Sequence, residues 1–303
     1  MSKPRNHHYV SRVLSNKFMS PAGRIHKYNK HHKYNKYRTK STTKSLFSKT
    51  DLNVIKDKDG NLDHESVEAE LNNNFETNFD KHYRIITEAV EADREIGKVI
   101  DNSELVLESI RYLIGMALIG EARHPERIEN INNAVFGLLF EIAQEATDEL
   151  KEEIYSSYRD VAEITNKNPT NFTKLRDSLE ESMGEIIYSI QIAPEDEYFL
   201  LPDCTAAQRR FALPPDIIDG QKFYHLAEPI GMVLMPINSK ILLIATSARL
   251  IPDELKTNGH GIYPIRKSLV HDFNKILFNE AYAEVACEDK KYLSDFVKSV
   301  VDE

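Results

Sequence analysis

Apolar residues recur every three or four positions between residues 64 and 189, and this period predicts a succession of helices. The helix expected over residues 102–120 is apolar almost all round, as in "YLIGMALIG", which is typical of a helix buried on every side. A further apolar stripe runs over residues 128–146. A last helix of this region is expected over residues 175–187.

After residue 189 the period of the pattern changes. The runs "EYFLLPDCTA", "GMVLMP" and "KILLIAT" are short, apolar and bounded by Pro, Asn, Ser or Gly, and "INS" joins the last two. They predict a small sheet that contains a hairpin. A final helix is expected from His271 to Val301. The fold class is therefore α+β: a mostly helical body with a small antiparallel sheet and a C-terminal helix.

The first fifty residues follow neither pattern for long. "VSRVLSNKF" predicts a short helix, "SPAG" a turn and "RIHKYNK" a short exposed strand, and residues 30–51 are polar enough to be a linker or arm. We divide the chain into a basic segment at 1–50, a helical body at 51–190, and a sheet with a helix at 191–303. The last two are expected to form one compact unit.

Length and composition are those of a protein that buries a core: 303 residues, 41% of them hydrophobic and 29% charged. The longest apolar run is far below the roughly 20 residues that span a bilayer, and no apolar stretch follows the first charges, so neither membrane insertion nor export is expected. The two cysteines lack CxxC spacing, which argues against a disulfide framework and a thiolate zinc site. We expect a cytoplasmic protein.

Charge is distributed unevenly along the chain. Residues 1–50 contain thirteen Lys or Arg and no Asp or Glu, although the whole chain has a net charge of −9. Cations interleaved with aromatic rings suit a nucleic-acid strand, because the cations contact phosphates and the rings stack on bases. The alternative is that this segment folds against the acidic body through solvated charge pairs. The candidate nucleic-acid-binding residues are Arg5, Arg12, Lys17, Arg24, Lys27, Lys30, Lys33, Tyr34, Lys36 and Arg38.

Standard catalytic motifs do not occur in the sequence, which has no GxGxxG, GxxxxGK[ST], HExxH or GxSxG. The repeated "HKYNK" offers imidazoles without carboxylate or thiolate, which is a poor transition-metal site. The adjacent His7 and His8 remain as candidates for proton transfer near neutral pH. The sequence leaves the cofactor open: a divalent metal is compatible with it, without defined ligands.

The opening "NHHYVSRVLSNKF", followed by "GRIHKYNK", resembles a bacterial and phage family known as domain of unknown function 4238. That family begins with His-His-Tyr-Val-Pro, a short helix ending in an aromatic residue, and a strand with Tyr; here Ser11 replaces the Pro. "ARHP" is similar to the family's Arg-Thr-Pro helix break. "LLPDCTA" echoes its Thr-Ser-Asp-Asn-Pro strand end with Asp203 at the acidic position, "VLMPINSKILLI" echoes a strand pair, and Asn279 corresponds to a near-terminal Asn.

The resemblance implies no established activity, and two hypotheses follow. In the first, the protein is a nuclease of phage–host conflict: His7 or His8 is the general base or a metal ligand, Asp203 is its partner, and Arg123 or Arg12 binds phosphate. In the second, it is a non-enzymatic nucleic-acid-binding or scaffold protein whose "HHYV" segment only docks against the sheet, while residues 1–50 contact RNA, DNA or an acidic macromolecule. His7 or His8 within about 4 Å of Asp203 or Asn279 in an open cleft favours the first hypothesis, and burial of both histidines with backbone partners only favours the second.

Overall fold

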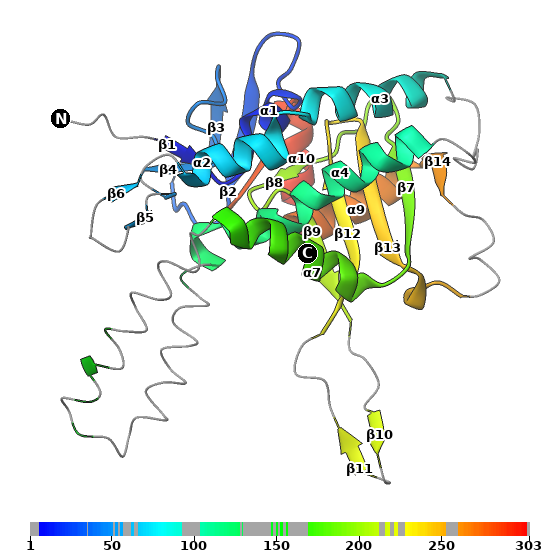
Figure 1. The fold of residues 1–303 in the computed structure, drawn as a ribbon. Coiled ribbons are helices and arrows are strands. Elements are labelled where there is room, and N and C mark those ends of the chain that lie inside the picture. The colour runs from blue at the N-terminus through cyan, green and yellow to red at the C-terminus, as the bar shows by residue number, and fades with distance from the viewer. Residues whose placement is uncertain are drawn as a thin grey trace.

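A computed structural model describes residues 6–34, 36–50, 66–92, 104–127, 169–211, 228–252 and 260–301, with short pieces at 52–53, 55–56, 62–63, 129, 147, 150, 152–153, 156, 216–218 and 221–223. Its helices and sheets confirm the α+β class (Figure 1). The sheets are larger than predicted, because one has five strands and another has four.

The five-stranded sheet has the order β14-β7-β13-β12-β9. The hairpin predicted from "GMVLMP" and "KILLIAT" is confirmed as β12 and β13, which pair in antiparallel fashion. β14 runs parallel to β7, so the sheet is mixed rather than purely antiparallel. The strands are β7 (Ile186–Ile192), β9 (Ala207–Arg210), β12 (Ile230–Pro236), β13 (Ile241–Ser247) and β14 (Gly261–Pro264).

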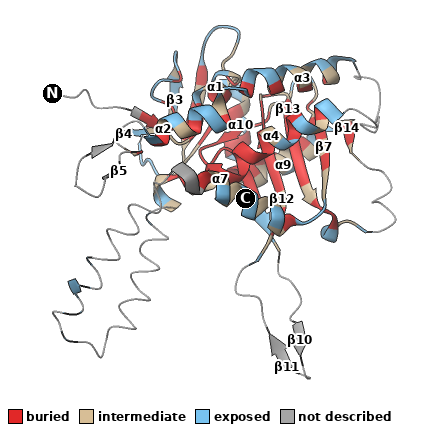
Figure 2. Cartoon of the chain, viewed as in Figure 1, coloured by how far each residue is buried: buried red, intermediate tan, exposed pale blue. Residues whose placement is uncertain are grey.

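Helices cover both faces of this sheet (Figures 1 and 2). Val233 and Met235 of β12 belong to the main core with α4, whereas Leu234 faces α9 on the opposite side. Strands buried on both faces have continuous apolar sequences, which explains the uninterrupted runs in this region. The helices are α3 (Phe79–Ala92), which packs on α4 (Glu104–Gly120), together with α7 (Pro169–Met183) and α9 (Lys267–Glu280).

The four-stranded sheet joins the two ends of the chain in the order β3-β2-β15-β8. β2 lies inside this sheet, so the prediction of an exposed strand is wrong. The reason is that its partner, β15, follows more than 250 residues later, where no local pattern reveals it. The strands are β2 (Ile25–Asn29), β3 (Tyr37–Lys40), β8 (Leu201–Pro202) and β15 (Glu284–Cys287), and α10 (Lys290–Val301) packs on them.

The described residues of 30–51, which are 30–34 and 36–50, are not a linker, and this corrects the second prediction for the region. β3 pairs with β2, β4 pairs with β1, and Leu46 and Phe47 are buried in the main core. The short helix predicted earlier in the chain, from "VSRVLSNKF", is confirmed as α1. The short elements are β1 (Asn6–His8), α1 (Arg12–Asn16), β4 (Ser48–Thr50), β5 (Ile55–Lys56) with β6 (Leu62–Asp63), α2 (Ser66–Leu71), the π-helix η1 (Asn72–Glu76), the 3₁₀ turns η2 (Glu121–Arg123) and η4 (Ala248–Leu250), and β10 (Asp216–Ile218) with β11 (Gln221–Phe223).

Two predicted helices end earlier than expected. α7 stops at Met183, where Gly184 takes a φ of +70° that suits a helix end, so Ile186 and Ile187 belong to β7 instead. The helix predicted from His271 to Val301 is two helices, α9 and α10, with β15 between them. The apolar stripe at 128–146 lies outside the described residues except Glu129. Among the helices that the structure describes, none is long and apolar enough to span a bilayer.

Candidate active site beside His124

The carboxylate of Asp203 is fully buried and organises the turn between α9 and β15. Its Oδ1 accepts the backbone N–H of Tyr282 at 2.9 Å, and its Oδ2 accepts those of Ala283 and Glu284, both at 2.8 Å. The backbone N–H of Asp203 donates in turn to the carbonyl of Glu284 at 3.0 Å. The Asp203 side chain therefore fixes the backbone at the start of β15, about 80 residues further along the chain.

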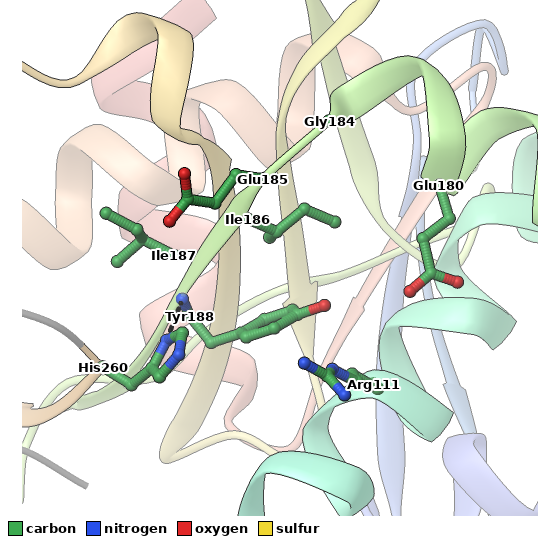
Figure 3. Close-up of a pocket in the computed structure, with 8 residues that line it drawn as sticks. All are labelled: Arg111, Glu180, Gly184, Glu185, Ile186, Ile187, Tyr188 and His260. Carbon is green, nitrogen blue, oxygen red and sulfur yellow. Dashed lines mark hydrogen bonds between the residues drawn. The ribbon is translucent and has the colours of Figure 1, made fainter. Parts of the chain in front are cut away.

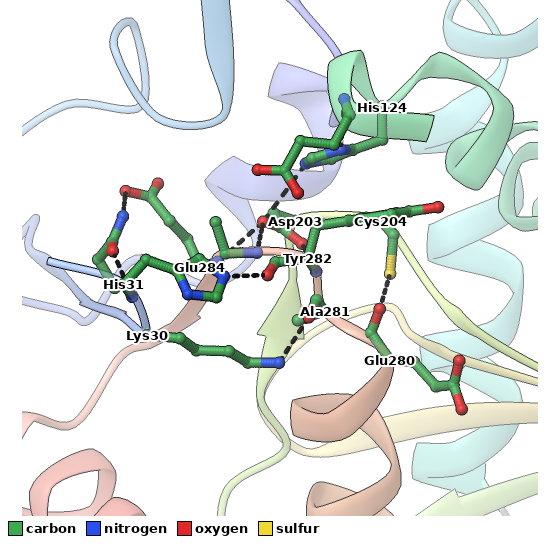
Figure 4. Close-up of polar contacts among 12 residues, drawn as sticks. Lys30, His31, His124, Asp203, Cys204, Glu280, Ala281, Tyr282 and Glu284 are labelled. Carbon is green, nitrogen blue, oxygen red and sulfur yellow. Dashed lines mark hydrogen bonds and ion pairs between the residues drawn. The ribbon is translucent and has the colours of Figure 1, made fainter. Parts of the chain in front are cut away.

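His124 is the side chain that meets this carboxylate (Figure 4). Its Nε2 lies 3.4 Å from Oδ2 of Asp203, and its Nδ1 accepts the backbone N–H of Glu126 at 3.2 Å. Because Nδ1 is an acceptor, the neutral ring carries its proton on Nε2, directed at the carboxylate. The Tyr282 ring stacks on the imidazole at 4.1 Å between centroids, and Tyr9 contacts it edge-on at 4.9 Å.

Tyr9 brings the "HHYV" segment to the same place. Its backbone N–H donates to the carbonyl of Phe47 at 3.0 Å, next to the pairing of β1 with β4. Burial raises the pKa of Tyr9, and the nearby carboxylates of Asp203 and Glu284 raise it further. The Tyr9 hydroxyl is therefore neutral at physiological pH and is able to donate a hydrogen bond.

His7 and His8 have backbone partners rather than Asp203. The backbone N–H of Asn53 donates to Nδ1 of His7, which is 3% exposed, at 2.9 Å. Nδ1 of His8 donates to the carbonyl of Leu46 at 3.0 Å, and burial lowers the pKa of His8. This geometry is the one expected for a docking role of "HHYV".

Arg123 also supports the docked segment. Its Nη2 donates to the carbonyl of His8 at 2.6 Å, its side chain is buried, and burial lowers its pKa. Asn279 lies exposed on α9, whereas the buried Asn274 of the same helix binds the backbone of Leu200 and Tyr198. The structure thus brings Arg123 to His8 and Asp203 to His124, and it does not make one cluster of all the predicted residues.

A pocket of about 360 Å³ opens beside His124, which lies within the size range of small-molecule sites. On one wall, Nζ of Lys27 contacts both carboxylate oxygens of Glu284 at 2.6 and 2.7 Å, and Asn29 donates to the same carboxylate at 3.0 Å. The pocket is lined by Tyr9, Lys27, Asn29, Ser45, Phe47, Ser48, Lys49, His124, Pro125, Glu126, Glu129, Ala283 and Glu284.

The predicted nucleic-acid-binding residues divide into two groups. Lys27 pairs with Glu284, Lys17 pairs with Asp80 at 2.8 Å, and Lys30 donates to the carbonyl of Ala281, so these three contact the body of the protein. The Lys27–Glu284 pair is largely buried, with side chains 10% and 14% exposed, so it is not a fully solvated charge pair. Arg5 lies outside the described residues. The exposed members are Arg12, Arg24, Lys33, Tyr34, Lys36 and Arg38.

A second pocket, of about 440 Å³, shares no lining residue with the first (Figure 3). Its walls come from α4, α7 and β7. The backbone N–H of Tyr188 donates to Nδ1 of His260 at 3.0 Å, and the Tyr188 ring points toward Arg111. Glu180 and Glu185 also line this pocket, so its charges are of both signs.

The family model described as a protein of unknown function (DUF4238) matches residues 6–291. The chain belongs to this family. The resemblance seen in "NHHYVSRVLSNKF" is thereby confirmed and extends over nearly the whole chain. No curated protein and no solved structure matches the chain.

His124 lies at the centre of the candidate site, and the sequence pattern did not predict it as a site residue. "ARHP" marks a helix break, and the signal available was only a histidine between Arg123 and Pro125. Its importance depends on Asp203, which is distant in sequence. Within the described parts of the chain, no group of three or more His, Cys, Asp or Glu side chains is arranged to hold a metal ion.

Proposed function

We propose that the protein binds nucleic acid through the basic hairpin, which we define as β2, β3 and the residues between them (25–40). The observation that supports this proposal is the exposure of Lys33, Lys36 and Arg38 on one hairpin whose sequence contains no Asp or Glu. Phosphate groups bind such cations and release counterions, which gives salt-sensitive affinity.

The net negative charge of the chain makes the local positive charge of the basic hairpin important for binding a polyanion. At −9 overall, the protein repels a polyanion as a whole, so any attraction has to come from a local concentration of positive charge. The cations that contact the body, such as Lys27, stabilise the sheet and position the hairpin. Lys33, Lys36 and Arg38 do not make such contacts with the described residues of the body of the protein, and their side chains are exposed to solvent.

Phosphodiester cleavage is a second candidate function, and the position of the pocket favours it. At the base of the hairpin, Lys30 and His31 bond to the carbonyls of Ala281 and Tyr282, which adjoin the turn held by Asp203. A strand bound on the hairpin therefore lies beside the His124 pocket. A carboxylate that orients an imidazole is a common arrangement for general acid–base catalysis. For this role, Nδ1 of His124 would act on the substrate in place of its contact with the backbone N–H of Glu126.

Binding and cleavage assays with labelled single-stranded RNA, single-stranded DNA and duplex DNA, with and without Mg²⁺, test both functions. We expect the wild type to bind and the Lys33→Ala/Lys36→Ala/Arg38→Ala variant to lose at least tenfold in affinity. The matched control is Lys81→Ala/Lys174→Ala/Lys298→Ala, which removes three exposed positive charges elsewhere and is expected to bind as the wild type does. Equal affinities of the two triple variants would contradict the proposal.

The enzymatic candidate needs a separate variant. His124→Gln is expected to abolish cleavage while it leaves hairpin binding intact. Binding by the wild type without cleavage of any of the three substrates would exclude nuclease action on them and leave a nucleic-acid-binding protein.

A further inference from the structure

We infer that the ligand of the basic hairpin is single-stranded nucleic acid and that Tyr34 stacks on one of its bases. This inference rests on the proposed function and specifies the class of nucleic acid. Tyr34 is 85% exposed, more than any other exposed large hydrophobic residue in the described parts of the chain. In the sequence it lies between the exposed cations Lys33 and Lys36, and Nζ of Lys33 lies 5.3 Å from the centroid of its ring.

The base of the loop that carries Tyr34 is held in place by several hydrogen bonds (Figure 4). Oδ1 of Asn29 accepts the backbone N–H groups of His31 and His32 at 2.9 and 2.8 Å. Lys30 donates its backbone N–H to the carbonyl of Ala283 and its Nζ to that of Ala281. A loop fixed at its base in this way presents a ring with little loss of conformational entropy on binding.

A further hydrogen bond places the base of this loop close to the His124 pocket. Nε2 of His31 donates to the carbonyl of Tyr282 at 2.9 Å, and the Tyr282 ring stacks on His124. The hairpin loop is therefore joined through one residue to the wall of the pocket. A strand stacked on Tyr34 would pass along Lys36 and Arg38 or toward this pocket.

An exposed aromatic ring distinguishes single strands from duplexes. Cations bind the phosphates of both forms, but the faces of paired bases are covered by their neighbours in a duplex, whereas an unpaired base has a free face for an aromatic side chain. Three hairpin cations alone would bind either form. The fully presented tyrosine adds a contact that only the single strand makes.

The experiment uses the absence of tryptophan from the chain. Tyr34→Trp introduces a single tryptophan, whose fluorescence reports stacking at this position alone. We expect oligo(dT) and oligo(U) of about 20 nucleotides to quench it, and a duplex of the same length to bind without quenching. In parallel, anisotropy titrations with labelled oligonucleotides compare the wild type with Tyr34→Ala and Tyr34→Phe.

Tyr34→Ala is expected to weaken single-strand binding about tenfold or more and to change duplex binding less than twofold, while Tyr34→Phe keeps the single-strand affinity. If Tyr34→Ala binds single strands as the wild type does, or if bound single strands leave the fluorescence of the Tyr34→Trp variant unchanged, the inference is wrong and the proposed function stands. Equal losses for single strand and duplex also overturn it. If the wild type binds none of the oligonucleotides, the proposed function itself is wrong.

Discussion

Oδ2 of Asp203 and Nε2 of His124 lie 3.4 Å apart, with both side chains almost completely buried. This pair connects the residue that follows η2 to the turn that precedes β15. Tyr9 contacts the same imidazole, so the "HHYV", "ARHP" and "LLPDCTA" segments, which are far apart in sequence, meet at His124, and the first two also line the pocket beside it. Nuclease action there is a hypothesis, and the convergence makes it testable at named residues.

Asp203→Ala is expected to destabilise the fold by roughly 3–5 kcal/mol. The substitution removes the acceptor of three buried backbone N–H groups and the partner of His124 at once. Urea unfolding followed by circular dichroism measures the change. Asp80→Ala, which removes only the exposed end of an ion pair with Lys17, is the control and is expected to have a much smaller effect. Equal effects of the two substitutions would contradict this assignment.

The largely buried pair of Lys27 and Glu284 is expected to show strong coupling. Lys27→Met or Glu284→Leu alone leaves one largely buried charge without its ionic partner, which costs roughly 1.5–3 kcal/mol. The double variant has neither charge, and its free energy of unfolding is expected to decrease by much less than the sum of the decreases in the two single variants. A double-mutant cycle on unfolding free energies measures this coupling, and simple additivity would show that the pair contributes nothing.

Gly120→Ala is expected to destabilise the protein by about 1–3 kcal/mol. A Cβ at residue 120 would lie 2.5 Å from Cβ of Thr205 and 2.6 Å from the carbonyl oxygen of Cys204, so backbone would have to move beside Asp203. Gly115→Ala in the same helix is the control, because its Cβ meets only the flexible Arg176 side chain. The melting temperatures of the two variants test this prediction. A larger decrease in melting temperature for Gly115→Ala than for Gly120→Ala would contradict it.

The stability of the fold is expected to fall on acidification below pH 6.5, partly because of His8. Burial lowers the pKa of His8 below 6.5 in the folded state, so between that lowered value and 6.5 the unfolded chain binds more protons than the folded one. The free energy of unfolding therefore decreases as the pH falls through this window. Urea unfolding between pH 7.5 and 5 measures the slope. His8→Gln is expected to have a shallower slope, and an unchanged slope would show that His8 does not contribute.

The salt dependence of nucleic-acid binding reports how many phosphates the hairpin contacts. For a single strand, the slope of log K against log salt is about −0.7 per phosphate neutralised. Removing Lys33, Lys36 and Arg38 together is expected to reduce the magnitude of the slope by about two. Anisotropy titrations at salt concentrations from about 50 to about 200 mM measure this slope. A slope that does not change would place the phosphate contacts elsewhere.

Elements with a local pattern were predictable from the sequence. This holds for α1, α3, α4 and the β12–β13 hairpin. In each, apolar residues recur at the helical or strand period, or turn residues mark where the element ends. The family was also evident in "NHHYVSRVLSNKF", because that block is specific. These features depend on residues close together in the chain.

The remaining features depend on residues far apart, and only the tertiary structure decided them. β2 is interior because β15 pairs with it, and Lys27 is buried because Glu284 is its partner across 257 residues. For the same reason, Asp203 meets His124 rather than His7 or His8. A local pattern records which face of an element is apolar, but the choice of partner comes from packing that brings distant segments together, and that choice determines which polar side chains share a site.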